Sequence, residues 1–368
     1  MVDTRLNKFF FLVSVFIFCI SLENGTFRIV LAFINLMATS FLFFNSGLLI
    51  TRKLTIPIIF LSSIAIYYFF EKVLRGSSYS FHFYVAILSL LSAIFLISYI
   101  RNSNSKAIFS RLLEYMLAFH TLLFFVQFFL WHMVKIDLDY LYYLGVESNP
   151  HRSGFYGSYR ATGIFSEPSI YSTYIIAIIS IKYCIDGRIS KFMLMGLCSM
   201  LLSFSTMALI QAFCFVLFTY FRASLKSFFI LLFSCFVIFI SFSDSLFSRL
   251  ELYSNGEDSS NMSKLIIIEK WWSNDSLIKY GYSYIDKFKE GPEYIALGDL
   301  TFWMNNYLFF GLYIGSFFLF LYVSVLFERK LIINRMLFSI VLFKLSTFTF
   351  PLTSLVLCFY FYPIKSDK

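Results

Sequence analysis

The sequence predicts an all-α integral membrane protein with about twelve (10–12) transmembrane helices and two large external loops. Three observations lead to this fold class: 59% of the 368 residues are hydrophobic, only 14% are charged, and the apolar residues form long unbroken blocks. An ordinary soluble domain contains about 25% charged residues. The composition therefore excludes a soluble enzyme, a disordered protein and a fibrous repeat.

The apolar blocks define the predicted spans, because a helix needs about 20 apolar residues, usually 17 to 25, to cross a bilayer. Arg5 and Lys8 precede the first block, as in a signal peptide. No A-x-A-like cleavage site follows that block and another block comes at once, so we interpret it as a helix. The predicted spans are residues 9–22, 29–50, 54–70, 81–100, 112–131, 169–184, 192–203, 205–221, 228–242, 301–327, 336–350 and 352–363.

The apolar stretch 192–221 has two interpretations, because the polar run Ser203-Phe204-Ser205-Thr206 interrupts it. It forms either one long tilted helix or a tight hairpin of two helices, and the choice inverts the topology of every later segment. Lysines and arginines collect in short cytoplasmic loops. With the hairpin and a cytoplasmic N-terminus, more than half of the 30 lysines and arginines lie on one side. We therefore favour the hairpin.

The net charge of +9 has the same explanation, because the charges lie between apolar blocks and form no soluble basic face. The predicted partner is a lipid bilayer and not a nucleic acid. Two long polar segments, about 132–167 and about 243–300, lie on the external face in this topology. No internal repeat or low-complexity linker is visible, so residues 1–368 are interpreted as a single polytopic membrane domain.

Cysteine and histidine patterns do not predict a metal site or a cofactor. The six cysteines lie within or at the ends of apolar blocks and lack C-x-x-C spacing. The four histidines lack the spacings that place two imidazoles on one metal ion. We interpret the cysteines as small core residues.

The first external loop ends in the most informative stretch, residues 160–169 with the sequence RATGIFSEPS. A purely structural interpretation is available. Ser166 or Glu167 caps the following helix, Pro168 occupies its first turn, and Arg160 contacts lipid headgroups. In the functional interpretation, the same residues place a guanidinium and a carboxylate at the mouth of a helix. The residues alone favour neither interpretation.

This run, R-x-x-G-x-F-x-E-P-S directly before a span and in the first of two large external loops, resembles the Wzy-type O-antigen polymerases and their relatives. The second loop has weaker similarities to this family. Arg249 follows a span, and residues 258–264 resemble a D-x-S-x-x-x-R pattern with Lys264 in place of arginine. Further along, Gly281 is the one glycine of a G-x-G pattern, and Asp299 precedes a span that contains two glycines.

The resemblance implies an O-antigen or polysaccharide polymerase of the bacterial cytoplasmic (inner) membrane, with its active site facing the periplasm or the exterior. Such glycosyltransferases move a growing glycan from polyprenyl (undecaprenyl) pyrophosphate to a sugar hydroxyl of another lipid-linked repeat unit. The family needs no cofactor, because the donor is already activated on its lipid. A flippase and a chain-length regulator are partners by family analogy.

The implied reaction assigns roles to the candidate residues. The leaving pyrophosphate gains negative charge in the transition state, which cations stabilise. Arginine suits this role because its guanidinium binds phosphate bidentately and keeps its charge. Glu167 either accepts the proton of the acceptor hydroxyl or holds the arginines in place. The candidate catalytic residues are Arg160, Glu167 and Arg249, and the candidate substrate-binding residues are Arg152, Gly163, Asp258, Lys264 and Asp299.

Two other functions stay open. An O-antigen ligase of the related family carries a functional histidine in the later external region, whereas all four histidines here precede Gly154. A lipid-linked oligosaccharide flippase or other transporter usually shows related halves, and no such repeat is visible. Both observations favour the polymerase.

Lys344 is a charged residue in the middle of a predicted span, residues 336–350. A charge there is costly and usually faces a partner or a cavity. Lys344 either meets the lipid pyrophosphate or extends its ammonium group to the membrane surface.

Overall fold

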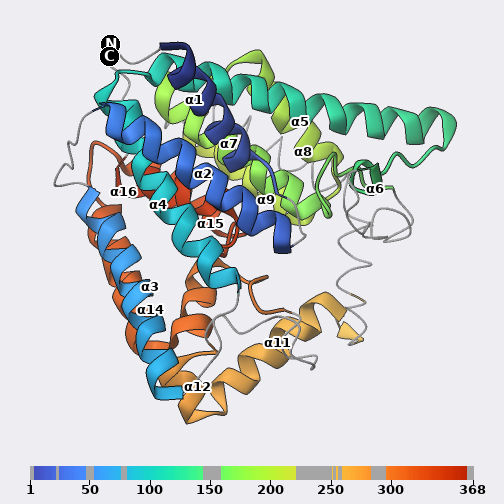
Figure 1. Cartoon of the computed structure of the whole chain (residues 1–368). Helices are drawn as coiled ribbons and strands as arrows, with labels where there is room; N and C mark the ends of the chain where they lie inside the picture. The colour runs from blue at the N-terminus through green and yellow to red at the C-terminus, as the bar shows by residue number, and fades with distance from the viewer. Residues whose placement is uncertain are drawn as a thin grey trace.

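The computed structural model describes residues 4–21, 25–46, 54–75, 81–143, 159–220, 251, 254–255, 259–282 and 296–362. These residues form helices and their connections, with no strand among them, in agreement with the predicted all-α class (Figure 1). The helices are α1 (Thr4–Cys19), α2 (Gly25–Ser46), α3 (Thr55–Arg75), α4 (Phe81–Asn102), α5 (Lys106–Val134), α6 (Tyr140–Tyr143), α7 (Pro168–Asp186), α8 (Lys191–Leu202), α9 (Thr206–Tyr220), α11 (Ser259–Trp272), α12 (Asp275–Tyr280), α14 (Phe302–Leu326), α15 (Ile332–Leu342) and α16 (Pro351–Phe361).

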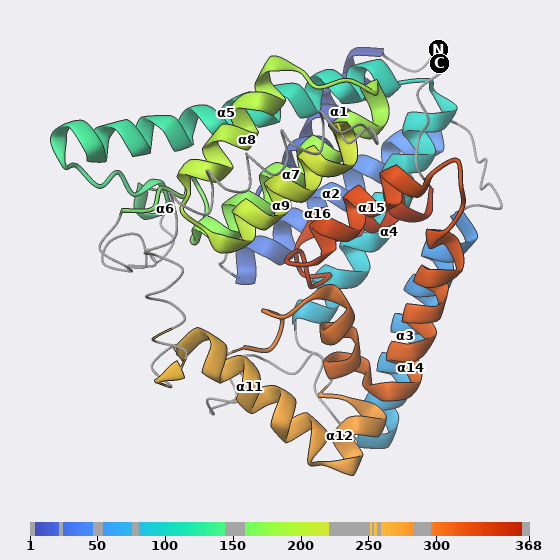
Figure 2. The ribbon, with the colours of Figure 1, turned by 180° about the vertical axis from the view of Figure 1, so that it is seen from behind.

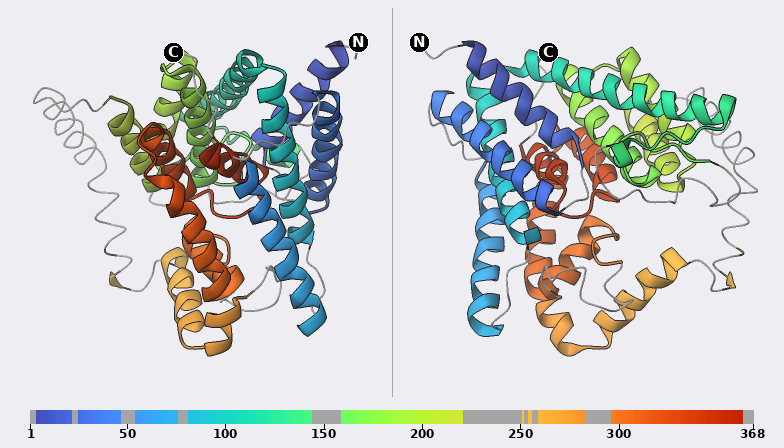
Figure 3. Two further views of the ribbon diagram at one scale, coloured as in Figure 1. Left: turned by 90° about the vertical axis from the view of Figure 1, so that its left-hand side faces the viewer. Right: turned by 45° about the vertical axis from the view of Figure 1, so that its right-hand side comes forward.

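The helices form a main body and an extension. Helices α1, α2, α4, α7, α9, α15 and α16 gather in the main body, and α5 and α8 lie along one side of it (Figures 1 and 2). Helices α3 and α14 extend from this body. At their far end lie α12 and α11, opposite α1 and α5 in every view (Figure 3).

Within the described residues, five helices are long and apolar enough to cross a membrane by length and composition. Large apolar side chains such as Met37, Leu122 and Phe320 are exposed on the outer faces of three of them. Lipid tails would cover such side chains, so the helices fit a bilayer environment. The five are Thr26–Ser46, His82–Asn102, Lys106–Val134, Pro168–Asp186 and Phe302–Leu326.

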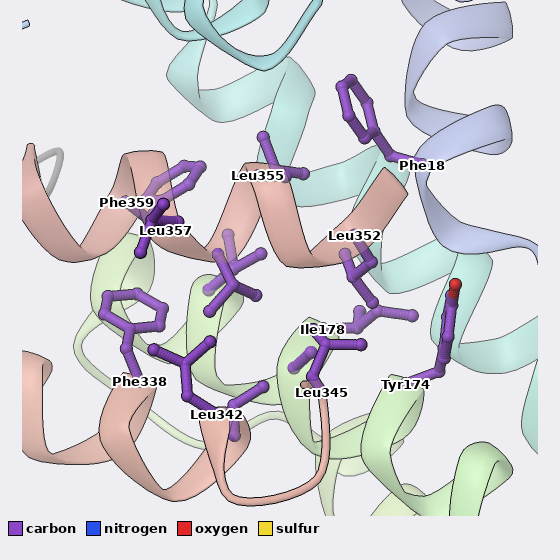
Figure 4. Packing of buried hydrophobic residues seen from close by; sticks show 14 of the residues in the cluster. Phe18, Tyr174, Ile178, Phe338, Leu342, Leu345, Leu352, Leu355, Leu357 and Phe359 are labelled. Carbon is purple, nitrogen blue, oxygen red and sulfur yellow. The ribbon is translucent and has the colours of Figure 1, made fainter. Parts of the chain in front are cut away.

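Helix α7 is the centre of the main body, because almost its whole circumference is buried. A helix that is apolar all round packs against neighbours on every side. Figure 4 shows Ile178 of α7 beside Leu345 and Leu352, and Phe338 of α15 near Phe359 of α16 further along the same cluster. The segment before α7, which contains the candidate motif, is therefore attached to a helix that is buried on almost every side.

The stretch 192–220 contains two helices, as in the favoured hairpin interpretation. Helix α8 ends where the Ser203 hydroxyl donates to the carbonyl of Met200 at 2.7 Å, and Phe204 turns the chain with φ of 50°. Helix α9 then begins at Thr206. Both helices are shorter than a bilayer requires.

The last two predicted spans differ from the structure. Helices α15 and α16 have only 11 residues each, and a loop at 343–350 joins them. Arg335, directly before the predicted span 336–350, lies inside α15 and is buried. There it pairs with Glu328 at 3.0 Å and donates to the carbonyl of Tyr360 at 3.2 Å. These partners satisfy the buried charge, which lets α15 begin four residues before the predicted span.

The long external loops are partly helical where the structure describes them. Helix α5 extends to Val134, inside the predicted first loop, and α6 follows it. Helices α11 and α12 lie inside the predicted second loop. The predicted span 228–242 lies outside the described residues.

A close backbone contact breaks α14 at Gly311, whose φ and ψ are 71° and −177°. Gly281, directly after α12, has a similar conformation with φ of 73° and ψ of −176° and lies against it. The Tyr67 hydroxyl of α3 lies 2.6 Å from the carbonyl of Tyr280 and 3.2 Å from that of Phe309. Three helices therefore meet at one joint, which fixes the direction of the first half of α14.

Replacing Gly311 with alanine should destabilise the chain strongly. The φ and ψ of Gly311 lie in a region that almost only glycine adopts, and other residues there lose about 1–3 kcal/mol. An added Cβ would also lie 2.3 Å from the carbonyl oxygen of Lys279. Gly196→Ala is the control, because its Cβ would meet only side-chain atoms, at 3.1 Å. Thermal unfolding in detergent should show the larger loss of Tm for Gly311→Ala. Equal losses would contradict a strained joint.

Candidate active site

The turn before α7 is held by Gln127, a buried residue of α5. Its side-chain oxygen accepts from the backbone N–H groups of Thr162 at 2.7 Å and Gly163 at 2.9 Å. Its amide nitrogen donates to the carbonyl of Leu138 at 2.7 Å. Gly163 has φ of 58°, a left-handed conformation that favours glycine. The candidate Gly163 is thus the pivot of this turn.

Glu167 occupies the N-cap position of α7, and Pro168 follows it in the first turn. The carboxylate makes no side-chain cap hydrogen bond to the backbone. Instead it accepts from the Ser169 hydroxyl at 3.0 Å. The position matches the structural interpretation of the motif, but the carboxylate does not act as a cap, and it is partly exposed.

Arg160 lies at the other end of the same turn and is partly exposed. Its neighbour Tyr159 stacks on Trp131 with ring centroids 4.4 Å apart and donates to the Asp137 carboxylate at 2.8 Å. These contacts fix the backbone that carries Arg160. The turn held by Gln127 therefore joins a guanidinium and a carboxylate within eight residues.

A second group of charges forms where three segments meet. Asp299, just before α14, pairs with Lys264 of α11 at 3.1 Å and also pairs with Lys344 of the loop 343–350. The exposed fractions of the Lys344, Lys264 and Asp299 side chains are 13%, 22% and 37%. Lys344 lies outside any helix and has a carboxylate partner, so its charge does not depend on reaching the membrane surface.

Hydrogen bonds between the two segments hold Asp299 and Lys344 together. The Ser346 hydroxyl donates to the carbonyl of Gly298 at 2.6 Å. The buried Asn305 amide donates to the carbonyls of Leu300 at 3.1 Å and Ser346 at 3.3 Å. Figure 2 shows the red loop between α15 and α16 beside the orange segment that leads into α14. The backbone on both sides of the ion pairs is thus fixed.

The electrostatics of Asp299 follow from these contacts. Burial raises the pKa of its carboxyl group, but the charges of Lys344 and Lys264, together with their hydrogen bonds, outweigh it, and the pKa lies below its ordinary value of 3.8. Two ammonium groups and one carboxylate have a formal net charge of +1. Asp299 also precedes the N-terminal end of α14, which favours negative charge. The cluster suits an anion such as a phosphate.

Aromatic rings connect the two groups of candidate residues. The ring of Tyr174 in α7 lies 4.9 Å from Phe165 and 6.2 Å from Phe350 between centroids. Phe350 belongs to the same loop as Lys344. The Arg28 guanidinium lies 5.4 Å from the centre of the Phe350 ring. The sequence prediction missed Arg28, although a cation between the first two spans, on the predicted external side, was a usable signal.

The structure therefore brings together Lys264 and Asp299 and adds Lys344 to them. It joins Arg160, Gly163 and Glu167 through one turn. The remaining candidates, Arg152, Arg249 and Asp258, lie outside the described residues.

No protein-family model matches the chain, and neither a curated protein nor a solved structure matches it. The described part defines an all-helical protein whose apolar helices fit a membrane.

The stability contributed by Asp299 should depend on pH with a defined sign. Its folded pKa is lowered from 3.8, so the contribution is full above the ordinary value and is lost as the pH falls through the folded value. The difference in unfolding free energy between the wild type and Asp299→Asn should stay constant from about pH 8 to about pH 5 and shrink below about pH 4. Chemical denaturation in detergent measures it.

Asp275→Asn is the control, because Asp275 is an exposed aspartate of α12. The difference in unfolding free energy between Asp275→Asn and the wild type should change less with acidification than the difference for Asp299→Asn. A difference for Asp299→Asn that persists unchanged to about pH 2 would contradict the ion pairing.

Proposed function

We propose that this chain is an O-antigen or polysaccharide polymerase, a glycosyltransferase that joins polyprenyl-pyrophosphate-linked oligosaccharide repeat units. The observation that carries the proposal is the cluster of Lys264, Asp299 and Lys344. Two of its members, Lys264 and Asp299, come from the segment that resembles the polymerase family, and the two lysines of the cluster suit a pyrophosphate. The motif with Arg160 and Glu167 is joined to this cluster through the loop 343–350.

The proposed reaction transfers a glycan without a cofactor. A sugar hydroxyl of the acceptor attacks the anomeric carbon of the donor, and the bond from that carbon to the pyrophosphate oxygen breaks. The pyrophosphate leaves on its lipid with the bonding electrons. Arg160, with Arg249 and Arg152, stabilises the charge on the leaving group. Glu167 accepts the hydroxyl proton, as a partly exposed carboxylate that no cap bond occupies can do.

The proposed topology places both groups on the external face of the bacterial cytoplasmic membrane. In this arrangement about twelve spans cross the bilayer, and the segments near 132–167 and 243–300 form the external loops. Lipid-linked donor and acceptor can then approach from the bilayer, against the exposed apolar side chains of the long helices. A flippase that delivers the repeat units and a chain-length regulator are the proposed partners.

Deletion of the gene in its native host tests the function directly. The surface glycan is separated by size, with and without complementation by the intact gene. A ladder that collapses to core carrying a single repeat unit supports polymerisation, because ligation and export still work. Loss of every repeat unit would indicate a ligase or a flippase, and an unchanged ladder would refute a role in glycan assembly.

The variants Arg160→Ala and Glu167→Gln should each abolish long chains while the protein still reaches the membrane. Loss of one electrostatic partner of the transition state typically costs on the order of 10²- to 10³-fold in rate. Arg249→Ala should behave in the same way. The assay is complementation of the deletion strain, with protein quantified in the membrane fraction.

Arg329→Ala and Glu269→Gln are the matched controls, since both residues are exposed and lie outside the candidate motifs. They should restore the ladder fully. If Arg160→Ala leaves the glycan chain lengths unaltered, Arg160 has no catalytic role and only contacts lipid headgroups.

A further inference from the structure

Asp299 bridges two cations in the way that a phosphate does. One oxygen of its carboxylate faces Lys264 and the other faces Lys344, and the two lysines come from segments 80 residues apart. A phosphate group also presents two oxygens from one central atom, with more negative charge. Lysine binds phosphate as a point charge and does not require the fork geometry of arginine.

The surroundings favour the same ligand. Helix α14 begins three residues after Asp299, and its N-terminal end carries partial positive charge. Phosphates bind readily at such helix ends. Lys344 is held in place by the hydrogen bonds that join its loop to the segment of Gly298. The two lysines thus converge on the Asp299 carboxylate, which lies three residues before α14 in the chain.

The carboxylate is the most exposed part of the cluster, at 37%, while the lysines are more enclosed. Asp299 lies in a turn outside any helix. Its side chain can therefore rotate toward solvent without unwinding α14. The lysines would stay in place, and an arriving anion would find both of them already charged and oriented.

We propose that Lys264 and Lys344 form a phosphate-binding site in which Asp299 is an exchangeable counter-ion. A phosphate of a lipid-linked pyrophosphate displaces the carboxylate, and the carboxylate returns when the phosphate leaves. The lysines thereby bind the substrate, and Asp299 limits how tightly they do so. The choice of a lipid-linked pyrophosphate as the occupant rests on the function proposed above. The exchange itself is non-covalent.

Binding to the purified full-length chain in nanodiscs tests this exchange. The probes are undecaprenyl pyrophosphate, inorganic pyrophosphate and the uncharged undecaprenol. The proteins are the wild type, Asp299→Asn, Lys344→Met and the control Lys330→Met. Lys330 is an exposed lysine of the turn between α14 and α15, outside the cluster.

Asp299→Asn should bind undecaprenyl pyrophosphate about tenfold more tightly than the wild type, because the competing charge is gone. Lys344→Met should bind it about tenfold or more weakly. Lys330→Met should bind undecaprenyl pyrophosphate like the wild type. The affinity for undecaprenol should be the same in all four proteins. Unchanged or weaker binding by Asp299→Asn would overturn the exchange and make Asp299 a residue that positions the lysines.

Further outcomes separate the sources of the phosphate. Inorganic pyrophosphate that binds as tightly as the lipid, with the same response to Asp299→Asn, would overturn the lipid-linked occupant in favour of a soluble anion. If Lys344→Met fails to fold, Lys344→Arg replaces it and should retain binding. The affinity of Asp299→Asn still tests whether the carboxylate exchanges with the phosphate.

Binding is measured without turnover, so this proposal and the polymerase proposal fail separately. If Asp299→Asn binds more tightly but the deletion strain has an unchanged glycan ladder, the phosphate-site proposal stands and the polymerase proposal is refuted. If the deletion strain has a collapsed ladder but Asp299→Asn does not bind more tightly, the polymerase proposal stands and the phosphate-site proposal is refuted.

Discussion

The described structure depends on the cost of leaving a positive charge unpaired among apolar side chains. Three enclosed cations meet this constraint by pairing between segments. Lys182 of α7 pairs with carboxylates of α5 and of its own helix. Arg335 pairs with Glu328, and Lys344 pairs with Asp299. Apolar packing is non-directional, so these directed contacts fix how the helices lie against one another.

The broken helix α14 must also find hydrogen-bond partners for its backbone groups at the break. A helix break in apolar surroundings leaves carbonyl groups without partners, and they must find others. The Tyr67 hydroxyl lies near two carbonyls at the break, and the N–H group of Tyr282 donates to the carbonyl of Leu308 at 2.6 Å. The break is therefore a joint with defined geometry. It holds the first half of α14, and with it Asp299, at a fixed place relative to α11 and α12.

The sequence predicts what depends on local properties and misses what depends on distant contacts. Composition and block length predict the helical, apolar character, and the distribution of lysines and arginines favours the hairpin whose turn lies at 203–206, between α8 and α9. The span prediction fails at 336–350 because four of the eight residues of the loop 343–350 are large and apolar, so block length does not reveal where α15 ends. Lys264 and Asp299 are predicted separately, through the resemblance. Their meeting with Lys344, 45 residues from Asp299, has no local signal.

The pairing constraint and the proposed chemistry meet at Asp299. Two lysines that wait for a phosphate in an enclosed place would repel each other and lose hydration. A resident carboxylate offsets this repulsion and keeps both ammonium groups oriented, so an arriving phosphate replaces one anion with another at lysines that are already in place. Because the same carboxylate competes for the lysines afterwards, it also weakens the hold on the spent pyrophosphate. One interaction that the fold needs at rest would thus promote both substrate binding and product release.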